Sequence, residues 1–163
     1  MDLGVTIVGG VIIAACVLPF VIMGRNKMRR EKKMLQSLSD LAKTQNCKIS
    51  NYEFCGDFVI GIDDDKKFAF FYKNAKGKET LDFVNLSDIH SCKSNKVAKT
   101  TKDSNGNTDV HDVVELCFVS NNKANQDHRF IFFNEEDSIR LSGELQVADK
   151  WSALINNLLK AVK

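Results

Sequence analysis

The chain begins with an uninterrupted apolar segment. From Leu3 to Met23 there are 21 residues without a charged side chain. A helix of that length spans about 31 Å, close to the roughly 30 Å of a bilayer's hydrocarbon core. A cleaved signal peptide would place basic residues before a shorter apolar core, and no Lys or Arg precedes Arg25. The pattern therefore predicts a transmembrane anchor over residues 1–24, with residues 3–23 in contact with the lipid bilayer.

Lipidation is a second interpretation of this segment. Residues 13–16, Ile-Ala-Ala-Cys, resemble the motif at which bacterial lipoproteins are acylated on cysteine, here Cys16. The absence of basic residues before it, and the apolar residues that continue to Met23, favour a membrane span instead. The sequence leaves lipidation of Cys16 as an open alternative.

A small-residue stripe runs along the same segment. Thr6, Gly10 and Ala14 lie four residues apart and share one face of a helix. This spacing permits close packing of two helices in a membrane. A homodimer through the transmembrane helix is therefore an alternative to a monomer.

The two ends of the apolar segment differ in charge. Six basic residues follow it and none precedes it: Arg25, Lys27, Arg29, Arg30, Lys32 and Lys33. Because basic residues flank membrane spans on the cytoplasmic side, we expect everything after the span to be cytoplasmic. Each of these side chains can also attract an anionic headgroup by about 1 kcal/mol.

Residues 27–45 have the periodicity of an amphipathic helix. Four apolar positions fall on one face: Met34, Leu38, Leu41 and Ala42. Asn46 is suited to end this helix. The apolar stripe is short, so we expect it to pack on the following domain rather than form a long coiled coil. We interpret residues 25–47 as a basic juxtamembrane helix and linker.

After residue 48 the periodicity changes to two, which is typical of strands. Apolar and polar residues alternate in seven short segments: 49–53, 58–62, 68–72, 81–83, 89–93, 114–118 and 130–132. Turn signals separate them, including Asp63–Asp65, Lys76–Lys78 and, inside the polar stretch 94–109, Asn105-Gly106. We expect roughly seven antiparallel strands that form a half-open barrel.

The C-terminal segment returns to helical periodicity. Its apolar residues lie at i, i+3, i+4, i+7 and i+11: Trp151, Leu154, Ile155, Leu158 and Val162. This predicts one amphipathic helix that begins as early as Glu144 and caps the open barrel with Trp151 buried. The predicted fold class is mainly β with helices: a transmembrane helix, a juxtamembrane helix, the barrel and one C-terminal helix.

Composition excludes several functions. Residues 34–163 contain 17 Lys and Arg against 19 Asp and Glu, whereas a nucleic-acid-binding domain is basic. The five cysteines include no C-x-x-C pair and are typical of reduced thiols. The three histidines are dispersed, and neither a nucleophile elbow nor a phosphate-binding glycine loop is present. We therefore expect no metal, no cofactor, no nucleic-acid partner and no enzymatic activity.

Seven strands followed by one helix that contains Trp151 resemble pleckstrin-homology-like domains over residues 49–162. The corner at residues 86–89, Leu-Ser-Asp-Ile, is similar to that of bacterial members, and the whole chain is similar to bacterial single-span membrane proteins. The resemblance implies that residues 48–163 form such a domain. Phosphoinositide-binding members carry several basic residues in and beside the first hairpin. Here we take that loop to be residues 63–67, Asp-Asp-Asp-Lys-Lys.

Two functions follow from these features. The first is a membrane-tethered, non-enzymatic interaction or scaffold module that binds an unknown protein partner at the cytoplasmic face. The alternative is a module that binds anionic lipid headgroups through Lys66, Lys67 and the basic cluster at residues 25–33. A protein partner would bind at a sheet edge or in the groove beside the last helix, for instance as an added strand.

Overall fold

The computed structural model describes residues 3–102, 108–122, 126–138 and 140–161; within residues 3–23 it describes the side chains of Cys16 and Pro19 only. The elements follow the chain as α1 (Leu3–Thr44), β1 (Asn51–Cys55), β2 (Phe58–Asp63), β3 (Phe68–Ala75), β4 (Lys78–Asn85), the 3-10 helix η1 (Leu86–Asp88), β5 (Ile89–Lys102), β6 (Thr108–Ser120), β7 (His128–Asn134) and α2 (Glu144–Lys160). The predicted mainly β fold with helices is confirmed.

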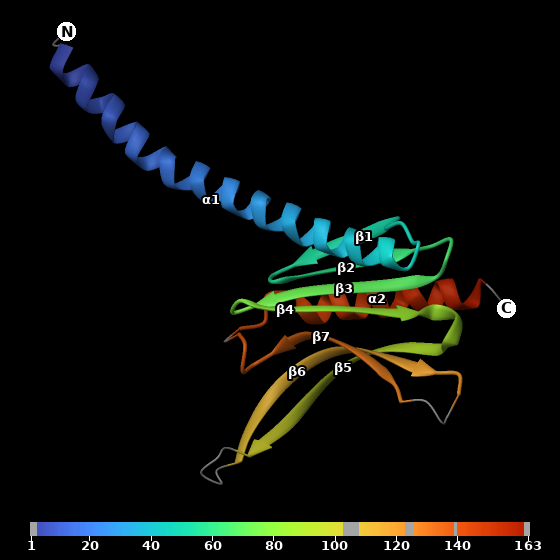
Figure 1. The fold of residues 1–163 in the computed structure, drawn as a ribbon. Helices are drawn as coiled ribbons and strands as arrows, with labels where there is room; N and C mark the ends of the chain where they lie inside the picture. The colour runs from blue at the N-terminus through green and yellow to red at the C-terminus, as the bar shows by residue number, and fades with distance from the viewer. Residues whose placement is uncertain (1–2, 103–107, 123–125, 139, 162–163) are drawn as a thin grey trace.

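The helix α1 is continuous over 42 residues. Its first half extends away from the strands and its second half lies along them (Figure 1). Within the part of the chain whose side chains are described, no helix is long and apolar enough to cross a membrane. Almost all side chains of the predicted span at residues 3–23, including those of Thr6 and Ala14, are outside the described part of the structure, and so is the environment of Gly10. The span and the helix-pairing face therefore stay predictions.

The C-terminus of α1 has the geometry of a Schellman motif. Asn46 has a φ of 55°, and the N–H of Cys47 donates to the carbonyl of Ala42. The N–H of Asn46 donates to the carbonyl of Lys43. These bonds satisfy carbonyls that the helix end would otherwise leave free. The predicted role of Asn46 as the end of the helix is confirmed.

The strands form two antiparallel sheets rather than a barrel. The first sheet has the order β1-β2-β3-β4 and the second has the order β5-β6-β7. The expectation of a half-open barrel is thus corrected to two packed sheets without closure. The physical reason is that the edge strands of the two sheets are not hydrogen-bonded to each other. The chain passes from one sheet to the other at the corner η1, where the Asn85 side chain accepts the N–H of Ser87.

Two details of the strands differ from expectation. The predicted polar stretch at residues 94–109 is strand as far as Lys102, because the backbone of β5 pairs with β6 along its length. An ion pair at 2.7 Å joins Lys96 of this stretch to Asp112 of β6. The predicted turn at Asn105-Gly106 lies outside the described residues.

The first hairpin is also not the one that we expected. β1 pairs with β2 through the tight turn at Gly56 and Asp57, in which Gly56 has a φ of 56°. The acidic loop at residues 63–67 therefore connects β2 to β3 and belongs to the second hairpin. The expectation that residues 63–67 form the loop of the first hairpin is therefore wrong.

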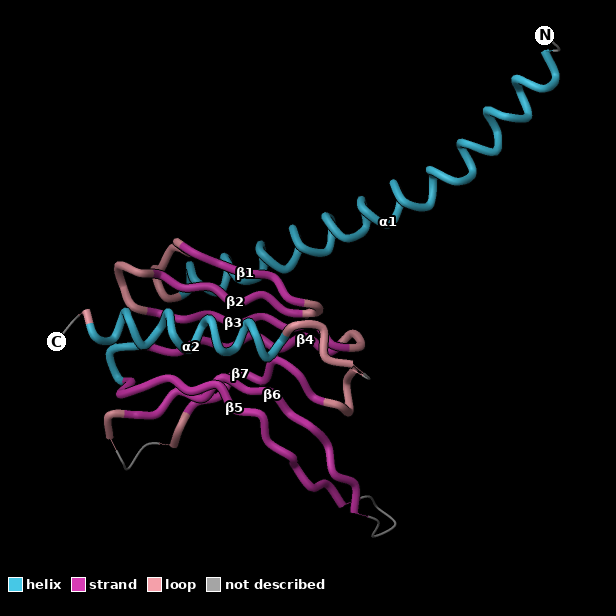
Figure 2. The backbone as a smooth tube through the Cα atoms, turned by 180° about the vertical axis from the view of Figure 1, so that it is seen from behind, coloured by secondary structure: helices cyan, strands magenta, loops and turns pink. Residues whose placement is uncertain are grey.

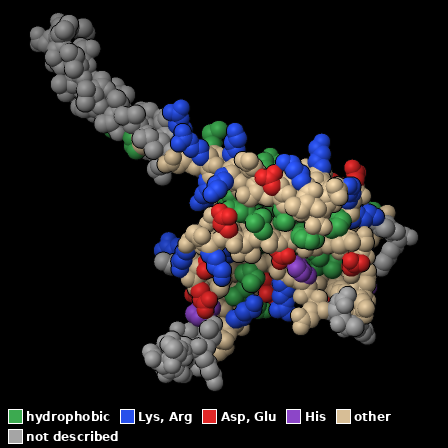
Figure 3. All heavy atoms as spheres, viewed as in Figure 1, with side chains coloured by type: hydrophobic (Ala, Val, Ile, Leu, Met, Phe, Trp, Pro, Cys, Tyr) green, Lys and Arg blue, Asp and Glu red, His purple; other side chains and the backbone are tan. Residues whose placement is uncertain are grey.

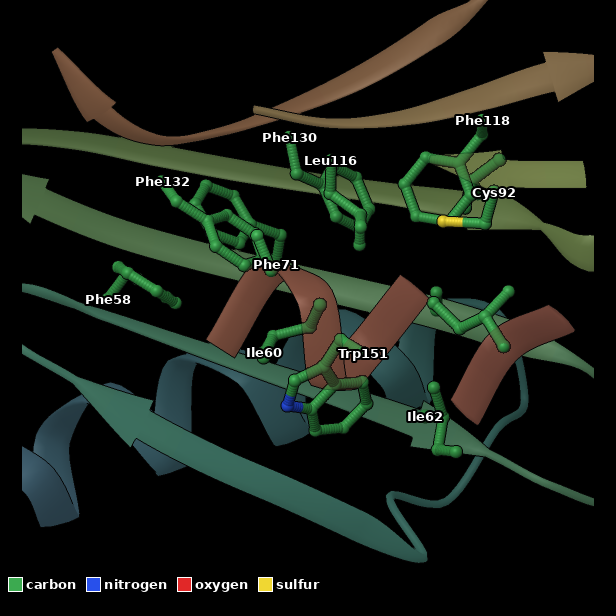
Figure 4. Close-up of a cluster of buried hydrophobic side chains, with 14 of the residues drawn as sticks. Phe58, Ile60, Ile62, Phe71, Cys92, Leu116, Phe118, Phe130, Phe132 and Trp151 are labelled. Atoms are coloured by element: carbon green, nitrogen blue, oxygen red, sulfur yellow. The ribbon is translucent and has the colours of Figure 1, made fainter. Parts of the chain in front are cut away.

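The main core lies between the two sheets and α2. It includes side chains that are at most 2% exposed from every layer: Phe58, Ile60, Phe71, Leu116, Phe118, Phe130, Phe132, Trp151 and Ile155. Figure 4 shows Trp151 directed into this cluster from α2. Trp151 is 1% exposed, which confirms its predicted burial, and its Nε1–H donates to Glu53 Oε2 at 2.7 Å.

A second core lies on the outer face of the first sheet, under α1. Met34, Leu38 and Ala42 are at most 2% exposed and pack with Val59, Phe70 and Tyr72. Leu38 Cδ2 lies so close to Gly61 that a Cβ there would approach it to 3.0 Å. The prediction that this helix packs on the domain is confirmed, and Met34, Leu38, Ala42 and Cys47 are part of its core.

Candidate functional site at the seam between β4 and β7

The flank that carries α2 is closed by side chains of the helix. Figure 2 shows α2 running along the opening between the two sheets. The N–H of Cys92 in β5 donates to Asn156 Oδ1 at 2.9 Å, and Asn156 Nδ2 donates to the Cys92 carbonyl at 2.7 Å. Ser152 Oγ donates to the same carbonyl at 3.0 Å. Asn156 thus replaces a strand partner at this edge, so an added peptide strand would find the Cys92 backbone already bonded.

A shallow groove remains on this flank between α2 and the ends of β1 and β2. Its volume is about 600 Å³, and its lining includes Leu154, Leu158, Lys150 and Asp64. The lining mixes apolar side chains with one basic and one acidic residue, so its charge favours neither anionic nor cationic ligands. This groove is the accessible part of the surface beside α2, where we expected a protein partner to bind.

The opposite flank is the seam between β4 and β7. Each is the last strand of its sheet, and within the described residues neither has a strand paired to its free edge. Side-chain contacts join the two sheets along this seam: His128 Nε2 to Asp82 Oδ2 at 2.9 Å, Lys73 Nζ to the Phe132 carbonyl at 3.1 Å, and Lys76 Nζ to the Glu136 carbonyl at 2.7 Å. The seam is therefore held by isolated bridges rather than by a ladder of backbone hydrogen bonds.

Lys73 is the central bridge and is only 6% exposed. The register between β6 and β7 shifts at Val114, which leaves Phe132 as an extra residue whose carbonyl accepts the lysine. A buried ammonium group needs such a partner, because desolvation without one is costly. Burial raises the pKa of nearby Asp57, while the charge of Lys73 opposes that rise.

A cavity of about 350 Å³ opens in the seam. It is lined by aromatic side chains, including Phe71 and Phe130, and by charged and polar ones: Lys73, Lys78, Thr80, Asp82, Arg129 and Asp137. Ile131, which is 39% exposed, also lines it. Leu81, which is 48% exposed, and Phe83, which is 36% exposed, lie on the other face of β4, on the side of their register partners Tyr72 and Phe70. Figure 3 shows hydrophobic side chains on the face that carries β4 and β7. This face combines free strand edges, apolar surface and charged groups of both signs.

All six residues of the predicted basic cluster are exposed and lie on α1 where it leaves the domain (Figure 3). Arg30 Nη2 donates to the Gly56 carbonyl at 2.6 Å, and Lys33 Nζ lies 3.6 Å from Glu79 Oε1. These two contacts connect the cluster to the turns of the first sheet. The cluster is therefore fixed to the domain at its C-terminal end.

Lys66 and Lys67 lie at the other end of the domain. Lys66 Nζ donates to the Asn46 carbonyl, at the C-terminus of α1. The 13 residues from Lys33 to Asn46 correspond to about 20 Å of helix. The structure thus separates these lysines from the basic cluster, whereas the lipid-binding alternative required both to face the bilayer.

The acidic loop beside these lysines has a structural role. Burial alone would raise the pKa of Asp63, but hydrogen bonds from the N–H groups of Lys66, Lys48 and Asp65 outweigh it and lower that pKa. The side chain is 4% exposed and organises the turn as an acceptor. The carboxylate of Asp63 is therefore hydrogen-bonded to backbone N–H groups of the protein itself.

Histidine and cysteine form no site in the described part of the chain. No group of three His, Cys, Asp or Glu there is placed to hold a metal ion. His90 is exposed, whereas Cys92 is 2% exposed. Burial, with a smaller contribution from Cys117, raises the pKa of Cys92 to about 12, which makes it a poor nucleophile.

Sequence reasoning missed Lys73 and Asn156. Lys73 follows Phe71 by two residues in a strand, and side chains two residues apart point to the same face of a sheet. The sequence therefore contained a signal that Lys73 points toward the core. Asn156 carried no such signal, because its partner is backbone 64 residues away. Comparison of the chain with protein-family models, with curated proteins and with solved structures gives no match.

Proposed function

We propose that this chain is a membrane-tethered, non-enzymatic interaction module whose folded domain is cytoplasmic. The observation that carries the proposal is the continuity of α1. One helix contains the apolar segment at residues 3–23 and, in its second half, Leu38 and its neighbours in the core of the domain. An environment that fixes the position of the first half of α1 therefore also fixes the position of the domain, because no flexible linker separates the two.

The contacts of α1 support a fixed orientation of the domain. Arg30 bonds the β1–β2 turn and Lys33 pairs with Glu79 at the start of β4. Surface ion pairs contribute little energy, but the buried Met34, Leu38 and Ala42 add a large apolar contact. A tether built in this way keeps the seam at one height and angle relative to the bilayer. Such positioning suits recognition of a protein in or beside the membrane.

The relationship to pleckstrin-homology-like domains is part of the proposal. The four-stranded and three-stranded sheets, followed by a helix that buries Trp151, support it. Domains of this kind act mainly as recognition modules, and the resemblance implies that role here. The seam, with its cavity and the exposed edge of β4, is the surface that we assign to recognition.

Fractionation of cells that express the full chain or residues 25–163 tests the tether. We expect the full chain to sediment with membranes at high salt and the truncated chain to stay in solution and unfold cooperatively. A cytoplasmic reporter fused after Lys163 should be active, and a reporter that requires export should be silent. Sedimentation of residues 25–163 at high salt, or the reverse reporter pattern, would contradict the proposal.

Binding of anionic headgroups is the alternative function, and one observation favours it. Arg25, Arg29 and Lys32 are exposed, and the described residues offer them no ion-pair partner. Sedimentation of residues 25–163 with vesicles of phosphatidylserine, against vesicles of phosphatidylcholine, tests it. Binding that is lost after substitution of these three residues by Gln would favour the lipid-binding alternative. If residues 25–163 bind neither kind of vesicle, the result favours the protein-interaction module over the lipid-binding alternative.

A further inference from the structure

The strand β4 has an exposed and unpaired edge. Residues 78–81 and Phe83 are exposed, and β4 is the last strand of the first sheet. A free edge of this kind is a template for pairing with another strand. We propose that β4 pairs antiparallel with β4 of a second copy of this chain, about a two-fold axis at Thr80. The two four-stranded sheets then form one sheet of eight strands.

The charges of β4 are self-complementary about Thr80. An antiparallel pairing centred there places Lys78 opposite the partner subunit's Asp82 and Asp82 opposite the partner subunit's Lys78. Thr80 then lies opposite its own copy. Opposite charges and Thr–Thr pairs are favourable when they lie directly across an antiparallel ladder. Because a two-fold axis repeats each contact, one Lys–Asp pair becomes two.

Neighbouring registers lack this complementarity. Centring on Leu81 would place Lys78 opposite Val84 and Thr80 opposite Asp82. Centring on Glu79 or on Asp82 would place identical carboxylates directly opposite one another, which is destabilising. Among these registers, the one centred on Thr80 alone pairs the charges with their opposites.

The same pairing covers exposed apolar surface. Leu81 is 48% exposed and points to the outer face of the first sheet, like its register partner Tyr72 in the outer core. In the proposed register, Leu81 lies diagonally across from its own copy, within reach of a long side chain. Burial of this surface adds an apolar contribution to the backbone and charge pairing.

The other sheet edges are less suited to this role. At β5 the backbone of Cys92 is bonded by Asn156 and Ser152. At β1 the side chain of Glu53 holds Lys150 and Trp151 of α2 beside the edge. At β4 the contact from a helix side chain in the described residues is the exposed ion pair between Lys33 and Glu79, at 3.6 Å, which leaves the backbone of the edge uncovered.

The symmetry also agrees with attachment to one membrane. A two-fold axis perpendicular to the extended sheet keeps the outer faces of both copies on the same side. The second half of α1 covers that face in each copy, next to Phe70 and Tyr72. Both helices can therefore enter one bilayer. This argument rests on the proposed tethering, and confinement in the membrane raises the effective concentration of an interface too small for a stable soluble dimer.

Disulfide crosslinking of the full chain in membranes tests the pairing. Thr80→Cys is introduced in a Cys16→Ser background, since the other four cysteines are buried. The expected result is a disulfide-linked dimer upon mild oxidation. Ser87→Cys, at an exposed position outside the proposed interface, is the matched control and should stay monomeric. Equal crosslinking of both variants, or none at Thr80→Cys, would overturn the proposal.

A charge exchange between two chains separates pairing from folding defects. Lys78→Asp and Asp82→Lys are placed in separately tagged Thr80→Cys chains. Each variant alone opposes like charges at the interface, and we expect its crosslinking to fall about fivefold or more. Co-expression of the two should restore crosslinking, as heterodimers only, because each Asp then faces a Lys. A misfolded variant could not be rescued in this way, so failure of the mixture to recover would refute the register.

Two further readouts distinguish this inference from the proposed function. Sedimentation of every variant with membranes at high salt reports tethering regardless of dimerisation. Ala14→Cys in the same background reports pairing through the transmembrane face. Crosslinking at Ala14→Cys without crosslinking at Thr80→Cys would assign the second copy to the membrane helix and overturn the β4 interface.

Discussion

The two flanks of the sandwich are closed in different ways. On one flank, α2 fills the space between the sheets with Trp151 and Ile155, each at most 1% exposed. On the other flank, separate side-chain bridges from β3 and β4 to β7 join the two sheets around a cavity of about 350 Å³. The first flank is a continuous apolar contact, and the second leaves strand edges and apolar side chains exposed.

We expect this difference to separate the residues that stabilise the fold from those of the proposed recognition surface. Substitutions on the α2 flank remove buried contacts or leave buried backbone groups without partners, and such changes are costly. Apart from the buried Lys73, the polar groups at the seam are exposed or half-buried, and water mostly compensates for their loss. If the comparison holds, stability depends on the α2 flank, whereas association depends on the seam.

The largest expected effect is that of Trp151→Ala. It removes the largest buried side chain of α2 and its hydrogen bond to Glu53, so we expect a loss of about 3–5 kcal/mol in the free energy of unfolding. Chemical denaturation of residues 25–163 measures it. Trp151→Phe keeps most of the apolar volume and should cost less. An unchanged unfolding midpoint for Trp151→Ala would show that α2 does not stabilise the sandwich.

Asn156→Ala should have the next largest effect. It removes both hydrogen bonds to the backbone of Cys92, and we expect a loss of about 1–3 kcal/mol. Asn157→Ala is the matched control, because Asn157 is exposed on the same helix and should change stability by less than about 0.5 kcal/mol. Equal effects of the two substitutions would mean that Asn156 does not act through the β5 edge.

The strands and helices of the domain were predictable because apolar alternation is local. Residues 58–62 and 68–72 have period two and are strands, and the helical stripe from Trp151 placed α2 correctly. Where the alternation was weak, prediction failed. The turn at Gly56 and Asp57 was missed, so the first hairpin was assigned one strand too late. The polar end of β5 had no apolar face to mark it, since its backbone pairing alone makes it a strand.

The arrangement of the sheets and the candidate site depended on long-range contacts. The alternation of residues along β4 and β7 gave no sign that these strands would lie beside one another without pairing. The bridge between His128 and Asp82 joins residues 46 apart, and the contact from Lys73 to Phe132 joins residues 59 apart. Such pairs follow from the packing of two sheets, which a single sequence does not specify. The basic cluster was readable because six charges after an apolar segment form a local pattern.

Asp82→Asn tests how much the seam contributes to the stability of the sandwich. It removes the charge opposite His128, but both side chains are about a third exposed. We therefore expect a loss of less than about 1 kcal/mol, well below that of Trp151→Ala. Chemical denaturation of residues 25–163 measures it, with Asp88→Asn, at an exposed position in η1, as the control. A loss as large as that of Trp151→Ala would show that the seam is a structural closure.

The smallest expected change in stability is that of Leu81→Ser. Leu81 is 48% exposed in the isolated chain, so we expect a change near 0.5 kcal/mol or less. In membranes the same substitution should reduce crosslinking at Thr80→Cys, because it removes the apolar contact proposed between the two copies of Leu81. Ile131→Ser is the matched control: Ile131 is 39% exposed on β7 and lies outside the β4 pairing. If Leu81→Ser leaves crosslinking unchanged, or if Ile131→Ser reduces it equally, the apolar contribution at β4 is refuted. A large loss of stability in Leu81→Ser would instead remove the distinction between the two flanks, since the exposed edge of β4 would then support the fold.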